Sequence, residues 1–236
     1  MQRREFIGFC AAGAAAGAAP VASITQAAAD ATPHFYSRAK LLDSAGSPLR
    51  AAKVPAHRNL IFHYPYDTTP CFLLNLGRPL SASARLKTAD ARSYEWTGGV
   101  GAGRSLVAYS AICAHQLAYP TRDISFISYR SERGAGNRHR NVIHCCAEHS
   151  QYDPAHGARV VAGPAPQPLA AILLEHVPGS DELYAVGTLG GEMFEKFFAK
   201  YAIRLELERG GSTKMTVGDS AVVTELDAYC RQQVKC

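Results

Sequence analysis

Short apolar segments alternate with turn-forming residues over most of the chain. The segments are four to eight residues long, and Gly, Pro, Asp and Ser separate most of them, which is typical of β-strands joined by turns. The sequence therefore predicts a mainly β domain over residues 59–190. Its strands are expected at Asn59–Tyr64, Cys71–Leu76, Ser105–Ala111, Ile124–Tyr129, Val142–Cys146, Ala158–Val161, Leu169–His176 and Glu182–Val186.

The pattern is different on both sides of this domain. Asp30–His57 is polar and irregular, which predicts a lead-in segment over residues 30–58. After Gly191, Glu192–Tyr201 carries Met and aromatic residues at helical spacing, and Asp219–Val234 places apolar residues on one helical face. The sequence therefore predicts a short helical C-terminal extension over residues 191–236, packed on the β domain.

The first 29 residues look like a targeting segment. Arg3 and Arg4 precede Phe6–Ile24, a run of 19 uncharged residues rich in Ala and Gly, and small residues follow at Ala27 to Ala29. This arrangement resembles a twin-arginine export signal. The alternative is a single transmembrane anchor, although the Ala and Gly content makes the run weakly hydrophobic. We expect export to the periplasm, with a membrane association only if the signal is retained.

Composition narrows the class of protein. Apolar residues make up 47% of the 236 residues and charged residues 19%, so the chain can form a packed core. The net charge is +5 without a Lys/Arg block, which argues against a nucleic-acid partner. Seven cysteines do not make a simple disulfide framework, and metal ligation is the obvious use for some of them.

Two short motifs carry candidate metal ligands. Cys113-Ala114-His115 and Cys146-Ala147-Glu148-His149 each follow an apolar strand and each offer one thiolate and one imidazole. Two Cys and two His fit a tetrahedral zinc site or a [2Fe–2S] cluster with the two cysteines on one iron and the two histidines on the other. Zinc fingers usually pair Cys with Cys and His with His, whereas each motif here mixes the two.

The pairing of Cys-x-His with Cys-x-x-His resembles the signature of Rieske proteins. Tyr152-Asp153-Pro154 and the proline loop Gly163-Pro164-Ala165-Pro166 resemble segments that follow the second motif in that family. The segments around residues 62–77 and 99–113 resemble the small Rieske subunit of arsenite-oxidase-type enzymes, which also carries a twin-arginine signal. The resemblance implies an antiparallel β-sandwich with a cluster-binding subdomain.

The resemblance also implies roles for individual residues. Cys113 and Cys146 would hold the buried iron, and His115 and His149 the exposed iron, from which the electron would leave. Ser150 and Tyr152 would donate hydrogen bonds to sulfur and raise the reduction potential. Glu148 would lower the potential because a carboxylate near the cluster disfavours an added electron.

Three departures from the family pattern stand out. The positions of a disulfide that many members have beside the cluster are Ala118 and Glu148 here, so that bridge is absent. His149-Ser150-Gln151-Tyr152-Asp153 is one residue shorter than the usual His-x-Ser-x-Tyr-Asp. Thirdly, 30 residues separate His115 from Cys146, and they include an arginine-rich insert at about 122–141. This insert is either a solvated loop or a docking surface for an acidic partner.

The remaining cysteines and histidines have simpler interpretations. Cys145 is expected to be a buried bystander, because only Cys146 has the two-residue spacing to His149. His144 is expected to be structural, and Cys71 to be part of the core. Cys230 and Cys236 are expected either to form a disulfide with each other or to stay free.

These observations favour a non-catalytic electron-transfer subunit. It would take electrons from a larger catalytic partner, a molybdenum oxidoreductase of the arsenite-oxidase type, and pass them to a c-type cytochrome. The alternative is the Rieske subunit of a quinol:cytochrome c oxidoreductase. An oxygenase with its own catalytic iron does not fit, because only 87 residues follow His149.

Overall fold

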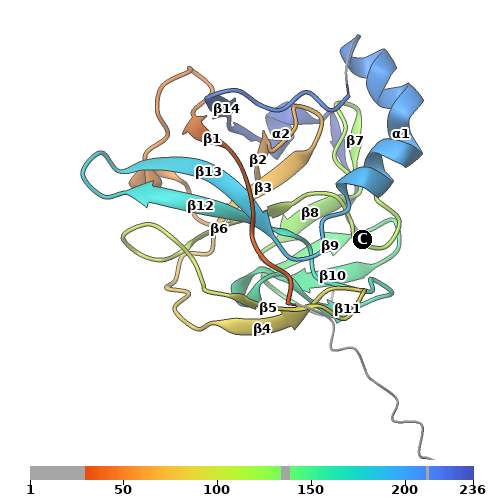
Figure 1. Cartoon of the computed structure of the whole chain (residues 1–236), viewed down its shortest axis with the longest axis horizontal. Coiled ribbons are helices and arrows are strands. Elements are labelled where there is room, and N and C mark those ends of the chain that lie inside the picture. Colours follow the sequence, from red (N-terminus) through yellow and green to blue (C-terminus); the bar gives the residue numbers. More distant parts are fainter. Residues whose placement is uncertain (1–29, 134–138, 211–212) are drawn as a thin grey trace, which may run out of the picture.

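A large sheet and a smaller sheet form the body of the protein (Figure 1). The computed structural model describes residues 30–133, 139–210 and 213–236, so the expected export signal at 1–29 lies outside the described residues. The eight strands of the large sheet lie in the order β14 (Ser220–Val222), β1 (His34–Leu42), β13 (Glu182–Leu189), β12 (Ala171–Val177), β6 (Leu106–Ser110), β3 (Pro70–Asn75), β2 (Leu60–His63) and β15 (Thr224–Glu225).

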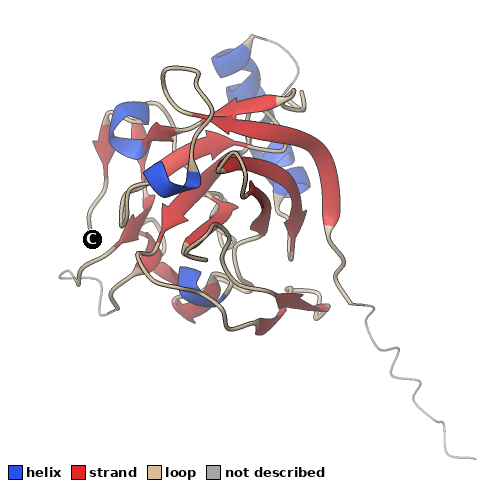
Figure 2. Ribbon diagram, turned by 90° about the vertical axis from the view of Figure 1, so that its left-hand side faces the viewer, coloured by secondary structure: helices blue, strands red, loops and turns tan. Residues whose placement is uncertain are grey.

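The smaller sheet has four antiparallel strands. They lie in the order β11 (Arg159–Ala162), β10 (Ser150–Asp153), β9 (Val142–Cys145) and β8 (Ile127–Arg130). Two further pairs join β4 (Ala84–Lys87) to β5 (Ser93–Trp96), and β7 (Ile124–Ser125) to β16 (Gln232–Gln233). The helices are α1 (Phe194–Arg209), the single turn α2 (Leu226–Tyr229), and 3₁₀ turns at Ala51–Lys53 and Pro154–His156. Figure 2 shows these helices on the outside of the strands.

The core lies on both faces of the large sheet, and β3 shows why. Successive residues of a strand point to opposite faces, and five of the six residues of β3 are buried. Cys71 and Leu73 pack inside the curled large sheet, whereas Phe72 and Leu74 pack toward the small sheet with Ile143 and other residues of β9 and β10. A continuous apolar sequence is therefore what a strand covered on both sides requires.

The prediction of a mainly β protein is confirmed. Each of the predicted strands corresponds to one or two of the observed strands, with Ile124–Tyr129 divided into β7 and β8. The helix predicted at Glu192–Tyr201 is present as α1, which continues to Arg209. None of the helices in the described part of the chain is long and apolar enough to cross a membrane.

Two of the predictions for the flanking segments are wrong. The lead-in segment contains β1, which pairs with β13 along the large sheet. The helix predicted at Asp219–Val234 is replaced by β14, β15, α2 and β16. The edges of the sheets supply hydrogen-bond partners to this backbone: β14 pairs in parallel with β1, and β15 pairs with β2. Ala221 and Val223 are buried while Val222 is exposed, so the period of burial is that of a strand.

Candidate metal centre

The first motif lies on a tight loop after β6. The Cys113 N–H donates to the carbonyl of Ala118 at 2.8 Å, and the Leu117 N–H donates to the carbonyl of Cys113 at 3.0 Å. Helix α1 packs against this loop, because Phe197 and its aromatic neighbours on the helix share an apolar cluster with Leu117 and Tyr119. The Lys200 ammonium also donates to the carbonyl of Gln116 at 2.7 Å. The extension after residue 191 therefore supports the first loop directly.

The second motif lies at the turn between β9 and β10. Cys145 pairs with Ser150 and His144 with Gln151, so residues 146–149 form the turn itself. Alternation along the two strands divides the side chains into two faces. Cys145 and Ser150 lie on one face, and His144 and Gln151 lie on the other.

The two motifs meet through Cys113 and Cys145. Both thiols are fully buried and are hydrogen-bonded to each other. The Tyr152 hydroxyl lies 3.3 Å from the Cys113 Sγ and accepts the Ala114 N–H at 3.1 Å. Cys145, expected to be a bystander, is therefore the cysteine of the second motif that faces Cys113.

This contact changes the acidity of both thiols in opposite directions. The hydrogen bond from Cys145, with a smaller contribution from Tyr152, lowers the pKa of Cys113 to about 6 despite its burial. The same interaction, together with burial, raises the pKa of Cys145. Two buried thiols in contact cannot easily both ionise unless a cation compensates their charge. A metal ion between them would provide that compensation.

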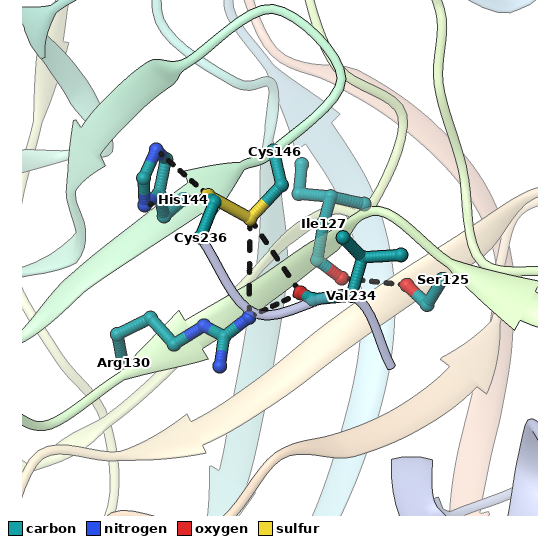
Figure 3. The surroundings of a disulfide bond; sticks show 7 residues. All are labelled: Ser125, Ile127, Arg130, His144, Cys146, Val234 and Cys236. Atoms are coloured by element: carbon teal, nitrogen blue, oxygen red, sulfur yellow. Dashed lines mark hydrogen bonds between the residues drawn. A yellow bond between two sulfur atoms is a disulfide. The ribbon is translucent and has the colours of Figure 1, made fainter. Parts of the chain in front are cut away.

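Cys146 is placed differently from our expectation. It forms a disulfide with Cys236, 90 residues along the chain (Figure 3). Cys146 is expected above to be a thiolate ligand and Cys236 to pair with Cys230 or stay free. The first expectation disagrees with this pairing because a sulfur in a disulfide is not a thiolate. The second disagrees because Cys236 is paired, and its partner is Cys146. Cys230 is a free buried thiol.

The neighbouring strand brings the disulfide cysteines together. The Cys146 N–H donates to the carbonyl of Phe126 at 2.6 Å, and the Val234 N–H donates to the carbonyl of Ser125 at 2.9 Å. The C-terminal residues and the β9–β10 turn are thus held side by side by consecutive carbonyls. The spacing of cysteines in the sequence gives no sign of this arrangement.

The two remaining predicted histidine ligands are both near the turns. His115 is half-buried, and its Nδ1 is a buried atom with no hydrogen-bond partner among the described residues. His149 is exposed and has a φ of 57°. Its ring centroid lies 5.9 Å from that of His144. Burial, followed by the effects of His149 and Arg130, lowers the pKa of His144 to about 4 and so keeps its ring neutral.

The three residues expected to tune the reduction potential of a cluster lie in different environments. Tyr152 contacts Cys113 as described. The Ser150 Oγ is buried with no hydrogen-bond partner among the described residues, on the face that Cys145 occupies. Glu148 is exposed in the turn. The two buried thiols, the unpartnered buried hydroxyl of Ser150 and the unpartnered buried Nδ1 of His115 are the types of group that a sulfide-containing metal cluster would use.

The proline loop closes over the second turn. Gly163 has a φ of 85°, and a Cβ at this position would lie 2.5 Å from the His149 carbonyl oxygen and from the Ser150 Cα. Only glycine allows the proline loop to approach the turn this closely.

The arginine-rich insert is partly structural. Arg130 donates to the carbonyl of Val234, and burial lowers its pKa. Arg133 and Arg140 are exposed, and they line a pocket of about 310 Å³ with Arg78, His139 and His156. Arg138 lies outside the described residues.

No family model matches the chain. Among solved structures, the chain is similar to the soluble domain of the Rieske protein II (soxF) from Sulfolobus acidocaldarius. The sequence identity is 24%, the match covers 66% of this chain and 82% of that chain, and the TM-score is 0.46. This likeness is distant, and the contacts of Cys113, Cys145 and Tyr152 are the stronger evidence for what the site does.

Proposed function

We propose that this protein is a Rieske-type electron-transfer protein. In this proposal Cys113 and Cys145 hold the buried iron of a [2Fe–2S] cluster, and His115 and His149 hold the exposed iron. The observation that carries the proposal is the contact of the Cys113 and Cys145 thiols in the core, with the Tyr152 hydroxyl on the Cys113 sulfur. A bound cluster of this kind supplies one-electron redox chemistry.

The spacing of the second motif supports Cys145 in place of Cys146. The family pattern Cys-x-x-His-x-Ser-x-Tyr sets the cysteine and the tyrosine seven residues apart. Cys145 and Tyr152 are seven apart, whereas Cys146 and Tyr152 are six apart. One extra residue before His149 compensates for the one missing after it. The tyrosine and the ligand cysteine therefore keep the strand register that places both on the same face.

The protein would bury the two cysteine ligands of the cluster, donate a hydrogen bond to one of them, and leave a histidine ligand exposed to solvent. The two thiolates lie in the core, where water does not screen their charge. The Tyr152 hydroxyl is held by the Ala114 N–H, so that it can direct its own hydrogen to the Cys113 sulfur. His149 is exposed, which allows an electron acceptor to approach it closely.

Cysteine variants test the proposal. The purified wild-type protein should be red-brown and hold two irons and two sulfides per chain, as the [2Fe–2S] composition requires. Cys145→Ser should lose the colour and the Rieske EPR signal, whereas Cys146→Ser should keep both. Cys71→Ser is a matched control, since Cys71 is a buried free thiol whose sulfur donates to the carbonyls of Tyr64 and Thr69.

The reverse result, with Cys146→Ser colourless and Cys145→Ser normal, would return the ligand role to Cys146. A colourless wild-type protein containing zinc in place of iron and sulfide would overturn the electron-transfer function itself.

We infer further that the partners are a larger molybdenum oxidoreductase of the arsenite-oxidase type and a c-type cytochrome. The resemblance of residues 62–77 and 99–113 to the small subunit of such enzymes supports the first partner. Exposed Arg133 and Arg140 offer a surface for an acidic protein. Co-purification of a molybdenum-containing subunit with the tagged chain tests this inference, and a chain that purifies alone at low salt would argue against it.

The same proposal places the protein in the periplasm. Arg3 and Arg4 before the uncharged run support a twin-arginine route, which carries folded proteins with their cofactors already inserted. Replacing both arginines by Lys should leave the coloured protein in the cytoplasm. Unchanged export of this variant, measured by cell fractionation, would refute the route.

A further inference from the structure

A second group of metal-binding side chains lies on the face opposite Cys113. Cys146, Cys236 and His144 have ligand atoms that all lie within 4.8 Å of one another, and the described residues hold no other such group of three. The Cys236 Sγ is 3.6 Å from both ring nitrogens of His144. Figure 3 shows the His144 ring next to the Cys236 sulfur and the Arg130 guanidinium next to the Cys146 sulfur.

We propose that reduction of the Cys146–Cys236 disulfide converts these three side chains into a zinc site. Cys146 and Cys236 would each supply a thiolate, His144 a ring nitrogen, and water the fourth position. Two thiolates and an imidazole with one open position is an established ligand set for zinc. The inference requires only that Cys146 is not a cluster ligand, as proposed above, since Cys236 and His144 belong to no cluster assignment.

The ligand atoms already lie close to the separations that a zinc ion requires. Zinc bonds of about 2.0–2.3 Å in a tetrahedral site place ligand atoms roughly 3.5 Å apart. Cys236 and His144 already have this separation. Because the Cys236 sulfur is equally far from both ring nitrogens, the His144 ring has to turn to aim one nitrogen at the ion. The two sulfurs, now bonded to each other, also have to separate, and their Cα atoms are 5.7 Å apart.

The C-terminal strand keeps Cys236 in place after reduction. Strand β16 pairs with β7, and the N–H groups of Gln232 and Val234 donate to Asp123 and Ser125 at 3.0 and 2.9 Å. These hydrogen bonds do not involve the disulfide. The two thiols should therefore stay close enough to bind one ion together.

The surroundings suit a thiolate–imidazole site. His144 is fully buried, and Cys236 is the one hydrogen-bond partner of its ring among the described residues. The Arg130 guanidinium lies 4.0 Å from the Cys146 sulfur, and its charge favours the thiolate form. Cys146 and Cys236 are both partly exposed, so a reductant and zinc can reach them.

The redox step needs a two-electron reductant, for which a dithiol of the thioredoxin class is suitable. The dithiol gives two electrons and two protons to the disulfide, which becomes two thiols while the dithiol becomes a disulfide. Zinc then displaces one proton from each thiol and binds one ring nitrogen of His144.

The test measures zinc in the full-length protein with its iron content known. Oxidised and phosphine-reduced samples are mixed with zinc sulfate, desalted and analysed for zinc, iron and sulfide. We expect one additional zinc per chain in the reduced sample and none in the oxidised one. Zinc X-ray absorption should show two sulfur ligands.

Variants identify the ligands. Cys236→Ser should weaken zinc binding by more than the roughly 10–100-fold that loss of a ligand's hydrogen-bond partner costs. Cys230→Ser is the matched control, because Cys230 is a free buried thiol in the same C-terminal segment, and it should bind zinc like wild type. His144→Gln should lower the affinity while leaving two sulfurs in the absorption spectrum.

Equal zinc binding before and after reduction, or full binding by reduced Cys236→Ser, would overturn the proposal. A colourless, iron-free protein that still binds zinc only when reduced, and loses it in Cys236→Ser, would refute the cluster and leave the zinc site standing.

Discussion

The Tyr152 hydroxyl oxygen lies 3.3 Å from the Cys113 sulfur while it accepts the N–H of Ala114. Because its oxygen is already engaged as an acceptor, its hydrogen is free to point at the sulfur. Such a hydrogen bond stabilises the more negative, reduced state of a thiolate-bound iron. Tyr152→Phe should therefore lower the reduction potential of the proposed cluster. A loss of about 1 kcal/mol corresponds to about 40 mV for one electron.

Protein-film voltammetry measures this shift. Tyr109→Phe is the matched control, since the Tyr109 hydroxyl is equally buried but donates to the carbonyl of Pro154 at 2.7 Å. A shift of the same size in both variants would mean that Tyr152 acts only through packing.

The effect of replacing Ser150 should depend on whether the cofactor is bound. Its Oγ is buried with no hydrogen-bond partner among the described residues, and an unpaired buried hydroxyl costs about 1–3 kcal/mol. Ser150→Ala should therefore leave the melting temperature of the cofactor-free protein unchanged or higher. The same variant should lower the reduction potential of the protein that holds the proposed cluster, since the hydroxyl that would donate to sulfur is lost. A destabilised cofactor-free variant with an unchanged potential would contradict both expectations.

Gly163 should tolerate no side chain. A Cβ there would meet the His149 carbonyl oxygen and the Ser150 Cα at 2.5 Å, and the φ of 85° is itself unfavourable for alanine. We expect Gly163→Ala to lower the free energy of unfolding by about 2–4 kcal/mol and to loosen the turn that carries His149. Chemical denaturation and amide exchange of the turn measure these effects.

Gly179→Ala provides the comparison, because a Cβ there meets no atom within 4 Å. Equal effects of the two substitutions would rule out the close approach as the cause.

Helix α1 should stabilise the loop of the first motif, residues 113–119. Phe197 is fully buried, and its ring packs edge-on against Tyr119, with centroids 4.9 Å apart. Phe197→Ala should cost about 3–5 kcal/mol and increase amide exchange at residues 113–119. Leu207→Ala on the same helix should have little effect, since Leu207 is 83% exposed. If Phe197→Ala increased amide exchange only in the helix, the stability of the loop would not depend on the helix.

The hydrophobic pattern was sufficient to predict most of the large sheet. Strands such as β3 are covered on both faces, so their sequences are apolar throughout and their limits are marked by turn residues. The C-terminal strands could not be predicted in the same way. Val222, Val223 and Leu226 fit a helical face, whereas the structure buries Ala221 and Val223 on either side of an exposed Val222. The free edges of β1 and β2 decide for the strands, because they supply hydrogen-bond partners to this backbone.

The sequence predicted where the candidate site lies, but only some of the residues that form it. The motifs indicated two loops that meet, and the structure brings Cys113 to the second loop. The prediction of Cys146 depended on its two-residue spacing to His149. The structure instead places Cys145, seven residues before Tyr152, against Cys113. That signal was present in the sequence, in the one-residue shortening after His149.

The partner of Cys146 is determined only by the tertiary structure. Two cysteines 90 residues apart carry no sequence signal of their pairing. They meet because the turn after β9 and the strand β16 are both hydrogen-bonded to residues 124–126. Local patterns record which face of a strand is buried, because burial repeats every second residue. Which distant segment covers that face depends on sheet edges that exist only after the chain has folded.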